Sequence, residues 1–393
     1  MQTVTPPPDR PSQDWVSLER GRKIRPFEWL GEKLIFSVSL TAILMVLLIF
    51  VFVLREALPL IFGRISTARV QEVIPVADFD KTPPEKLQTY LELTDKEFAE
   101  FDRERKLLLM TIKVEERAEV VEDKDAEVNG VSWKYLLQPH QWSGYSKPEY
   151  IWQPVSRIEK YNIVPLFIGS LKTTLVALLF AVPLSLAAAL YVSQLAPRAL
   201  KEWLKPAVEL LAGIPSVVLG FFGLLVIATV LDHLFGFQSR LNALVAGIAL
   251  GIAVIPVVFS IAEDALTSVP RSYQEAALAL GSSRWQTAWR IVLPAAMPGV
   301  FAAVVLGFGR AIGETMVVLL ASGNASIVSW SLLDSTRSIT ATIAAELAET
   351  VFGGAHYRIL FLLGTMLFAI TCIINLAAQM IMARFKSGLE GSR

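Results

Sequence analysis

The chain has 393 residues, of which 53% are hydrophobic and only 18% are charged, and its mean hydropathy is +0.51. A water-soluble protein of this length would have difficulty keeping so much apolar surface away from solvent, so the composition predicts an integral membrane protein. A formal net charge of zero excludes a global electrostatic attraction to nucleic acid. The single cysteine excludes an internal disulfide bond, and the scattered histidines predict no metal site.

Six apolar runs are long enough to cross a bilayer, whose core of about 30 Å needs about 20 apolar residues per helix. The first run is long and lacks a small-residue cleavage site, which indicates a retained anchor behind a basic amino-terminal tail, residues 1–33. We therefore predict six transmembrane helices. They cover residues 34–54, 164–192, 208–231, 241–262, 297–321 and 359–383.

The distribution of Lys and Arg near the ends of these runs predicts their orientation, because cytoplasmic loops carry an excess of basic residues. The basic segments alternate along the chain as six spans require, so both termini are predicted to be cytoplasmic. The other short loops offer little beyond Arg240 and Arg337. The basic segments are residues 1–33, the loop around Lys201, the loop 264–294 and the tail 385–393.

Residues 55–162 separate the first two spans and differ in character, with many carboxylates and no run that could cross a membrane. By parity this segment lies outside the cytoplasm. We expect a short helix over 84–106, a strand over 107–114 and an aromatic portion ending near Trp152. These elements predict a small inserted α+β domain, and the alternative, disorder, is less favoured because of the aromatic residues.

The loop 264–294 is predicted to form two short helices. Pro270 suits a helix start, Gly281 suits a helix stop, and Ser283 can cap a second helix that ends before Pro294. A compact helix with two alanines can settle into a groove of a soluble partner and follow that partner's motion. From the residue types alone, an ordinary amphipathic surface loop is an equal alternative.

A fixed spacing links a set of residues in this loop, namely Glu275, Ala276, Ala277, Gly281, Ile291, Leu293 and Pro294. This pattern resembles the EAA loop of ABC importer permeases, and no position of it is missing. The resemblance implies a coupling helix that docks on a separate ATPase subunit. The chain has no Gly-x-x-x-x-Gly-Lys-Ser/Thr loop, so we expect a transport subunit rather than an enzyme, without a cofactor, whose partner binds ATP and magnesium.

Two charged residues, Arg310 and Glu314, lie four apart inside the predicted span 297–321, so we expect them on one helix face. Unpaired charges at membrane depth cost about 3 kcal/mol or more, which makes them functional candidates. The guanidinium fork of Arg310 suits a tetrahedral oxyanion, Glu314 could hold Arg310 when no anion is present, and Thr315 could donate a hydrogen bond. The alternative is a structural ion pair that fixes helix packing.

Two glycine pairs have the four-residue spacing that lets a neighbouring helix backbone come close. Gly309 and Gly313 lie beside the charged pair, and Gly247 and Gly251 lie in the span 241–262. We therefore predict helix packing at both pairs.

The stretch 309–316, Gly-Arg-Ala-Ile-Gly-Glu-Thr-Met, resembles the signature of phosphate-system permeases, and its Met-Val-Val continuation is closer to the PstC type than to the PstA type. Residues 212–224 and 339–349 fit the same family. The second of these stretches is predicted to be a short external helix on which Glu346 and Glu349 form a solvated face. The alternative is that they lie near the point where a binding protein delivers substrate. The resemblance starts at residue 163 and leaves the segment 55–162 uncovered.

This resemblance implies an all-α integral membrane protein of the six-helix type I ABC importer (MetI-like) architecture, with a permease core over 163–384. It also implies phosphate import across the bacterial inner membrane, with a second permease subunit (PstA type), two ATPase subunits (PstB type) and a periplasmic phosphate-binding protein (PstS type) as partners. No nucleic acid partner is expected. The alternatives are a permease for sulfate, phosphonate or another small solute, and a membrane signalling subunit that docks a regulatory ATPase.

Overall fold

The computed structural model describes residues 26–67, 74–121, 125 and 128–390. Its internal contacts divide the chain into two units, residues 1–52 and 53–393, which we describe separately. Most of the predicted tail 1–33 lies outside the described residues, and helix α1 (Pro26–Ile61) begins within it. In the first unit α1 is apolar all round and exposes most of its side chains, as suits a helix surrounded by lipid.

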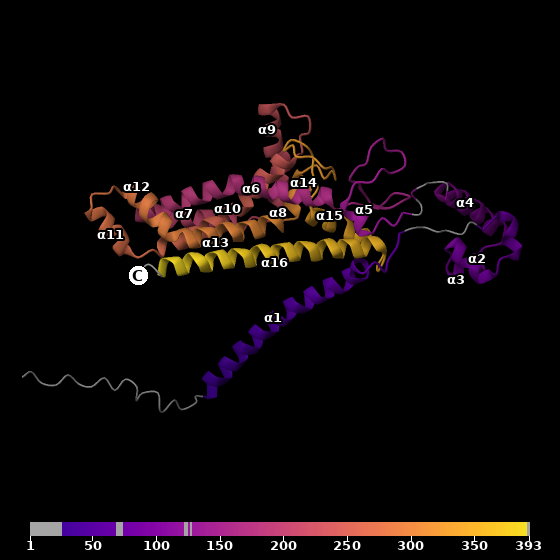
Figure 1. Cartoon of the computed structure of the whole chain (residues 1–393), viewed down its shortest axis with the longest axis horizontal. Helices are drawn as coiled ribbons and strands as arrows, with labels where there is room; N and C mark the ends of the chain where they lie inside the picture. The colour runs from indigo at the N-terminus through magenta and orange to yellow at the C-terminus, as the bar shows by residue number, and fades with distance from the viewer. Residues whose placement is uncertain (1–25, 68–73, 122–124, 126–127, 391–393) are drawn as a thin grey trace, which may run out of the picture. The chain divides into compact units, whose positions relative to one another are not determined.

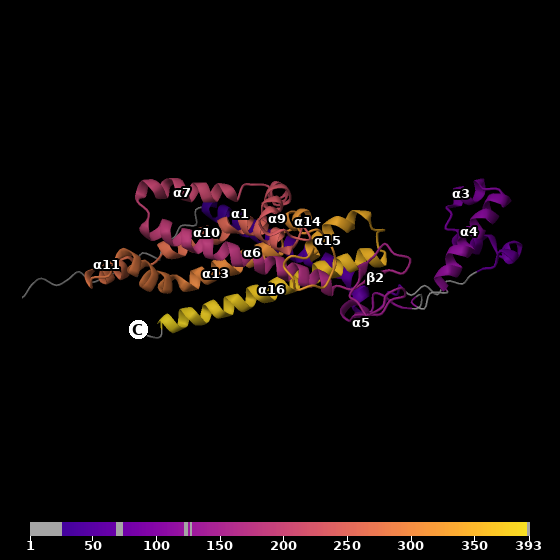
Figure 2. The same ribbon diagram turned by 90° about the horizontal axis from the view of Figure 1, so that it is seen from above.

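Six helical segments among the described residues are long and apolar enough to cross a membrane, which confirms the predicted number of spans. In the second unit, α6, α10, α13 and α16 run side by side (Figures 1 and 2). The six segments are Leu30–Ile61, Val164–Leu195, Ser216–Phe235, Ala243–Thr267, Arg284–Ile312 and Ala355–Met382.

Helix α10 (Ala243–Thr267) lies at the centre of the second unit, between α6 (Val164–Leu190) and α13 (Leu293–Ile312). Its side chains Leu250 and Phe259 are fully buried in the main apolar cluster. A Cβ atom at Gly247 would lie 2.4 Å from Val176 Cγ1 of α6, and one at Gly251 would lie 2.8 Å from Phe180 Cδ1. The missing side chains at these glycines therefore let α6 and α10 approach closely.

The start of the third predicted span, 208–231, is wrong. The chain forms α7 (Arg198–Leu211), turns, and begins α8 (Ser216–Phe222) after Pro215. Pro215 has no N–H to continue a helical ladder, and the turn is closed by the Ile214 N–H donating to the Leu211 carbonyl. The span then continues through a π-helical turn, η4 (Gly223–Ile227), into α9 (Ala228–Phe235), which ends at Gly236 in a left-handed conformation.

The fifth predicted span, 297–321, is wrong at both ends. Helix α12 (Arg284–Thr287) does not stop before Pro294 but continues through a π-helical turn, η5 (Ala288–Val292), into α13. Pro294 therefore lies inside a continuous helical segment, directly after the π-helical turn, and such turns are a common adjustment of the helical ladder. At the other end the helix breaks over residues 313–315 before a short α14 (Met316–Ala321).

The remaining elements of the second unit are shorter helices and turns and the last long helix. Helix α15 (Ile339–Glu346) continues into a 3-10 turn, η6 (Leu347–Glu349), which confirms the predicted short helix after residue 339. Helix α16 (Ala355–Glu390) extends through most of the predicted tail 385–393. Between α6 and α7 the chain passes through the π-helical turn η3 (Tyr191–Leu195), and α11 (Arg271–Ala279) follows α10.

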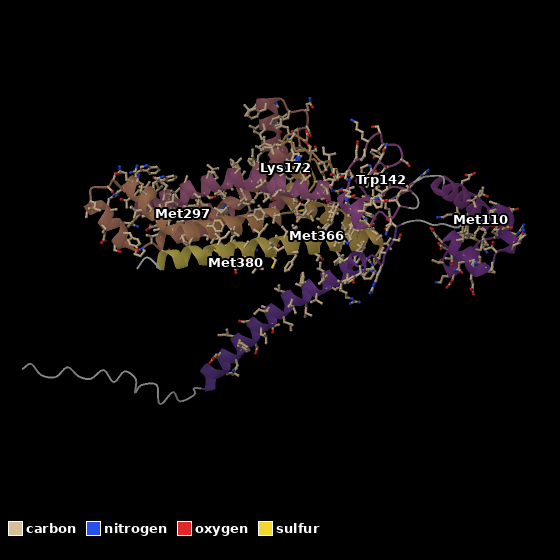
Figure 3. The ribbon with its side chains drawn as sticks, viewed as in Figure 1. Met110, Trp142, Lys172, Met297, Met366 and Met380 are labelled. Carbon is tan, nitrogen blue, oxygen red and sulfur yellow. The ribbon has the colours of Figure 1, made fainter. Side chains whose placement is uncertain are left out.

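The first part of the segment 55–162 is helical, and the predicted strand over 107–114 is wrong. After a 3-10 turn, η2 (Val76–Lys81), the predicted helix 84–106 divides into α2 (Pro84–Leu91), α3 (Asp95–Glu100) and the start of α4 (Arg103–Val121). Glu92 ends α2 in a left-handed conformation, and a capping box between Thr94 and Glu97 begins α3. Leu107, Met110 and Val114 have helical spacing and pack in one apolar cluster with Phe79 and Tyr90 (Figure 3 labels Met110).

The last part of this segment contains α5 (Trp133–Leu137) and a two-stranded antiparallel sheet, β1 (Trp152–Gln153) with β2 (Lys160–Tyr161). Trp152 pairs with Tyr161 across the sheet, and both side chains are buried. They share an apolar cluster with Leu166 of α6, Ile339 of α15 and Ile359 of α16. This part of the segment therefore packs directly on the membrane helices.

Candidate functional site

The loop between α10 and α13 has the local geometry that the sequence predicts. Glu275 and Ala276 on α11 are exposed, whereas Ala277 is buried against the following turn. Gly281 ends the helix with a φ of +86°, a conformation that a side chain would strain. Ser283 begins α12 with a capping box, in which its hydroxyl accepts from the Gln286 N–H.

This loop exposes large apolar side chains rather than a polar surface. Leu280 is 90% exposed and Trp285 is 59% exposed, and Trp285 stacks on Trp289 with ring centroids 6.2 Å apart. The remaining residues of the spacing pattern lie beyond the stack: Ile291 and Pro294 are exposed, and Leu293 is half-buried. Exposed aromatic and aliphatic side chains at a helical turn suit contact with another protein.

A buried carboxylate, Glu263, joins α10 to α7 directly before the loop. Its side chain is 1% exposed and accepts hydrogen bonds from Lys201 Nζ at 2.8 Å, Lys205 Nζ at 2.7 Å and Thr267 Oγ1 at 3.0 Å. The hydrogen bond to Glu263 raises the pKa of Lys205. We call these side chains the Glu263 cluster, and they tie α10, the helix before the loop, to α7, the helix that precedes the third span.

Arg310 lies in the last turn of α13 and lines a cavity of about 520 Å³ between α13 and α16. Its guanidinium has no hydrogen bond or ion pair among the described residues. The expected face shared with Glu314 is wrong, because α13 ends at Ile312 and Glu314 falls in the break that follows. The spacing of four residues places two side chains on one face only within an unbroken helix.

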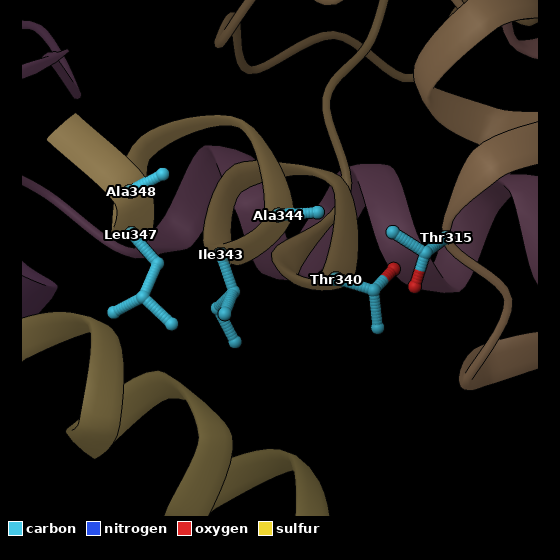
Figure 4. A pocket seen from close by; sticks show the side chains of 6 residues that line it. All are labelled: Thr315, Thr340, Ile343, Ala344, Leu347 and Ala348. Atoms are coloured by element: carbon cyan, nitrogen blue, oxygen red, sulfur yellow. The ribbon is translucent and has the colours of Figure 1, made fainter.

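The break in the fifth span positions Glu314 and Thr315. Glu314 Oε1 accepts from the Thr315 N–H at 3.2 Å, and the Glu314 carbonyl accepts from Thr340 Oγ1 of α15 at 2.8 Å. Thr315 lines a second cavity of about 410 Å³ together with Thr340 and apolar residues of α15 and η6 (Figure 4). The break thus lies between two cavities, one beside Arg310 and one beside Thr315.

Gly309 and Gly313 stand beside this break but make no close helix contact. A Cβ atom at Gly309 would meet nothing within 4 Å, and one at Gly313 would meet only carbonyl oxygens of its own helix turn. Both glycines line the cavity that contains Arg310. Their absent side chains leave space there, in contrast to the tight contacts at Gly247 and Gly251.

Glu346 is not solvated, and the prediction of an exposed face is wrong for this residue, although Glu349 is exposed. Its carboxylate, 13% exposed, lies 2.7 Å from Arg337 Nη2 and 2.9 Å from His356 Nε2, and it accepts from Trp152 Nε1 at 3.1 Å. Burial raises the pKa of Glu346, but the hydrogen bond with His356 and the charge of Arg337 outweigh burial and lower it. Arg337, His356 and Trp152 all lie outside α15, so helical spacing cannot predict these contacts.

Sequence reasoning missed Glu263 and two polar side chains of α16, Thr371 and Asn375, which line the cavity beside Arg310. A signal for the last two existed, since they are polar, four residues apart and inside an apolar span. No comparable signal existed for Glu263, because its lysine partners are about 60 residues earlier in the chain.

The family model described as "Binding-protein-dependent transport system inner membrane component" matches residues 181–389. A probable ABC transporter permease protein, YqgH, of Bacillus subtilis is 34% identical over 255 residues, which cover 64% of this chain and 82% of the relative. A phosphate transport system permease protein, PstC, of Xylella fastidiosa is 37% identical over 260 residues, which cover 61% of this chain and 79% of the relative.

Solved structures of similar chains include the MetNI methionine ABC transporter in inward-facing conformations, with 16% identity, coverage of 56% of this chain and 93% of that chain, and a TM-score of 0.43. A bacterial ABC transporter involved in the import of the acidic polysaccharide alginate is 18% identical. The match covers 56% of this chain and 79% of that chain, with a TM-score of 0.44. The matched family region contains α7 to α15 and most of α16, and the loop, the cavities and the Glu263 cluster all lie within it. The chain therefore belongs to the binding-protein-dependent transport system inner membrane components, the permease subunits of ABC importers, and resembles the PstC type among them.

Proposed function

We propose that this chain forms the translocation pathway of an ATP-driven phosphate importer. The observation that carries the proposal is Arg310, a guanidinium without a protein partner among the described residues, which lines a cavity at the end of a membrane span. Arg310 is exposed on this chain, and inside a membrane a cation is stable only where water, a polar ligand or another protein chain meets it. A guanidinium donates two parallel hydrogen bonds to a tetrahedral oxyanion, and several relatives are named as phosphate permeases.

Glu314 and Thr315 have secondary roles in this proposal. Glu314 lies in the break after α13 and does not pair with Arg310 within one helix. It therefore acts as a negative group beside the pathway, where its repulsion limits how long an anion stays bound at Arg310. Thr315 offers a hydroxyl to the cavity it lines. Phosphate would therefore pass the broken part of the fifth span rather than a continuous helix.

The exposed face of α11 is proposed to dock on an ATPase subunit. Glu275 and Ala276 present a compact surface there, and Leu280 and Trp285 supply apolar side chains that a protein groove can bury. Closure of the ATPase dimer on ATP would then move α11, and the two sides of the pathway would open in turn.

The remaining partners follow from the same proposal. Exposed apolar side chains on α8 and η4, such as Phe221 and Leu225, are available to pack on a second permease subunit of the PstA type. Two PstB-type ATPases and a PstS-type binding protein would complete the complex. The basic character of the loop that contains α11 supports a cytoplasmic position for the ATPases and for both chain termini.

The test is ATP-dependent uptake of inorganic phosphate into proteoliposomes that hold the complete complex. Arg310→Gln keeps the length of the side chain but removes its charge, and we expect uptake to fall at least about 10-fold, the loss typical of a charged hydrogen bond. Arg310→Lys retains the positive charge without the guanidinium fork, so its phosphate uptake should lie between that of the wild type and that of Arg310→Gln.

Assembly of the complex, checked by co-purification, serves as the control. Undiminished phosphate uptake by an assembled Arg310→Gln complex would contradict the proposed pathway. Equal competition by sulfate and by phosphate in the wild-type complex would contradict the proposed substrate.

A further inference from the structure

The cavity beside Arg310 has an unusual lining for a membrane span. Apart from the guanidinium, its polar side chains are Thr371 and Asn375, both on α16, and a large part of the rest is glycine and aliphatic or aromatic carbon. Thr371 and Asn375 are four residues apart, so they lie one above the other on the face of α16 that meets α13.

The hydrogen bonds of these side chains are incomplete. Thr371 Oγ1 donates to the Phe368 carbonyl of its own helix at 2.9 Å, a bond that a rotation about χ1 can exchange for a ligand. The half-buried Asn375 amide has no hydrogen-bond partner among the described residues, and neither has Arg310. The exposed guanidinium of Arg310 and the half-buried amide of Asn375 both line the cavity, so their N–H groups are available to an occupant.

The chemistry of the lining selects the occupant. The guanidinium supplies donors only, the Asn375 amide supplies two donors, and the Thr371 hydroxyl supplies one. Among the lining residues no carboxylate is present to repel an anion or to neutralise Arg310. A set of donors around one positive charge suits an ion that is rich in acceptors and negatively charged.

The size and access of the cavity fit a small ion with some of its water. Its volume of about 520 Å³ falls within the about 300–1,000 Å³ usual for small-molecule sites. Gly309, Gly313 and Gly364 line it without side chains, and a Cβ atom at Gly309 would point into open space. The ligand can therefore approach the backbone of both helices.

We propose that Asn375 and Thr371 complete, with Arg310, a donor-lined subsite for a tetrahedral oxyanion between α13 and α16. The inference rests on the proposed function and extends it, because it assigns a second helix to the pathway and names the groups that hold phosphate in transit. Asn375 binds the anion through its amide N–H groups, and Thr371 adds a hydroxyl hydrogen bond.

Transport of inorganic phosphate by the complete complex in proteoliposomes tests the subsite. Asn375→Leu keeps the size of the side chain without its donors, and we expect the maximal uptake rate to fall about 10-fold. Asn375→Asp should reduce uptake at least as much, because a carboxylate repels the anion and pairs with Arg310. Gln379→Glu, the same kind of change one turn along α16 and outside the cavity lining, should leave uptake unchanged.

A second measurement separates ligand contact from a structural role. In a Cys372→Ser background, the cysteine of an Asn375→Cys variant is labelled with a thiol reagent in detergent, with and without inorganic phosphate. Phosphate should slow the labelling, and removal of the charge by Arg310→Gln should abolish this protection. Protection by added phosphatidylglycerol but not by inorganic phosphate would overturn the inference in favour of a lipid headgroup.

The two proposals fail in different ways. If the wild-type complex transports phosphate and Asn375→Leu transports it equally well, the subsite is wrong and the proposed function stands. If the wild-type complex transports no phosphate, the proposed function is wrong and the subsite falls with it.

Discussion

Two carboxylates in the second unit, Glu263 and Glu346, are buried among hydrogen-bond donors. Glu263 has two lysines and a threonine, and Glu346 has Arg337, His356 and the indole of Trp152. A buried charge of this kind is stable only while its partners are present, and removal of one member typically costs about 3–5 kcal/mol. Each carboxylate joins elements that are distant in sequence, so each acts as a tie between helices.

The stability contributed by Glu346 should depend on pH. The pKa of Glu346 is lowered from its ordinary value of 4.5, so its contribution is complete above that value and is lost as the pH falls through the lowered value. We therefore expect Glu346→Gln to lower the thermal unfolding midpoint of the purified protein at neutral pH. The difference between the two proteins should narrow below about pH 4.5. Circular dichroism across a pH series measures both midpoints.

Glu349→Gln is the matched control, because Glu349 lies in η6, directly after α15, and is exposed. Its midpoint should follow that of the wild type at every pH. If the difference in unfolding midpoint between the wild type and Glu346→Gln stays constant from neutral to acid pH, the stabilising role of the Glu346 charge is wrong.

At the level of elements, the third span begins with α8 after the turn at Pro215, and α8 packs on α14, the short helix after the break that follows α13. A Cβ atom at Gly220 of α8 would lie 3.0 Å from the Met316 carbonyl of α14 and 2.7 Å from Leu320 Cδ1. The helix that precedes the third span, α7, is held to α10 by the Glu263 cluster. A movement of the loop after α10 can therefore be transmitted to α7, and from α7 to the turn at Pro215, through direct contacts between protein side chains.

This arrangement predicts that Glu263 positions the helices for coupling. In Glu263→Gln the neutral amide loses its ion pairs with Lys201 and Lys205, so α7 should follow α10 less closely. We expect phosphate uptake by the complete complex to fall about 10-fold while ATP hydrolysis is retained, which lowers the number of ions moved per ATP. Parallel assays of uptake and hydrolysis in the same proteoliposomes measure that ratio.

Asp264→Asn provides the comparison, because Asp264 contacts the same Lys205 but is 72% exposed. An exposed ion pair contributes little, so the coupling ratio of this variant should match the wild type. Equal losses of hydrolysis and uptake in Glu263→Gln would indicate a role in assembly instead.

At the scale of the whole molecule, the predicted orientation places the loop after α10 and the segment after α1 on opposite sides of the membrane. Leu280 and Val155 are suitable reporters, since they are 90% and 93% exposed. With Cys372→Ser as background, a membrane-impermeant maleimide applied to intact cells should label Val155→Cys and spare Leu280→Cys. Inverted vesicles should give the opposite pattern, because the positive-inside distribution of Lys and Arg sets the topology.

Labelling of both positions from one side would contradict six spans with cytoplasmic termini. Labelling of Leu280→Cys only after addition of detergent, in both preparations, would indicate that a partner already covers the loop.

The sequence by itself determined the number of membrane spans, the helix stop at Gly281, the helix cap at Ser283, and the family. Each of these follows from local patterns, namely apolar length, turn residues and fixed spacing. The breaks at Pro215 and Gly313 were also visible as residues, but their effect was not, because a proline or glycine in an apolar run can kink a helix or end it.

Only the tertiary structure decided which side chains meet. Glu346 contacts Trp152 across 194 residues, and the cavity beside Arg310 takes its other polar groups from α16 rather than from Glu314 four residues away. The physical reason is that buried charges and amides take partners wherever packing brings donors within about 3 Å, and packing depends on the whole set of helices. The strand predicted over residues 107–114 failed for a related reason, since the apolar contacts that made it helical come from α2 and η2.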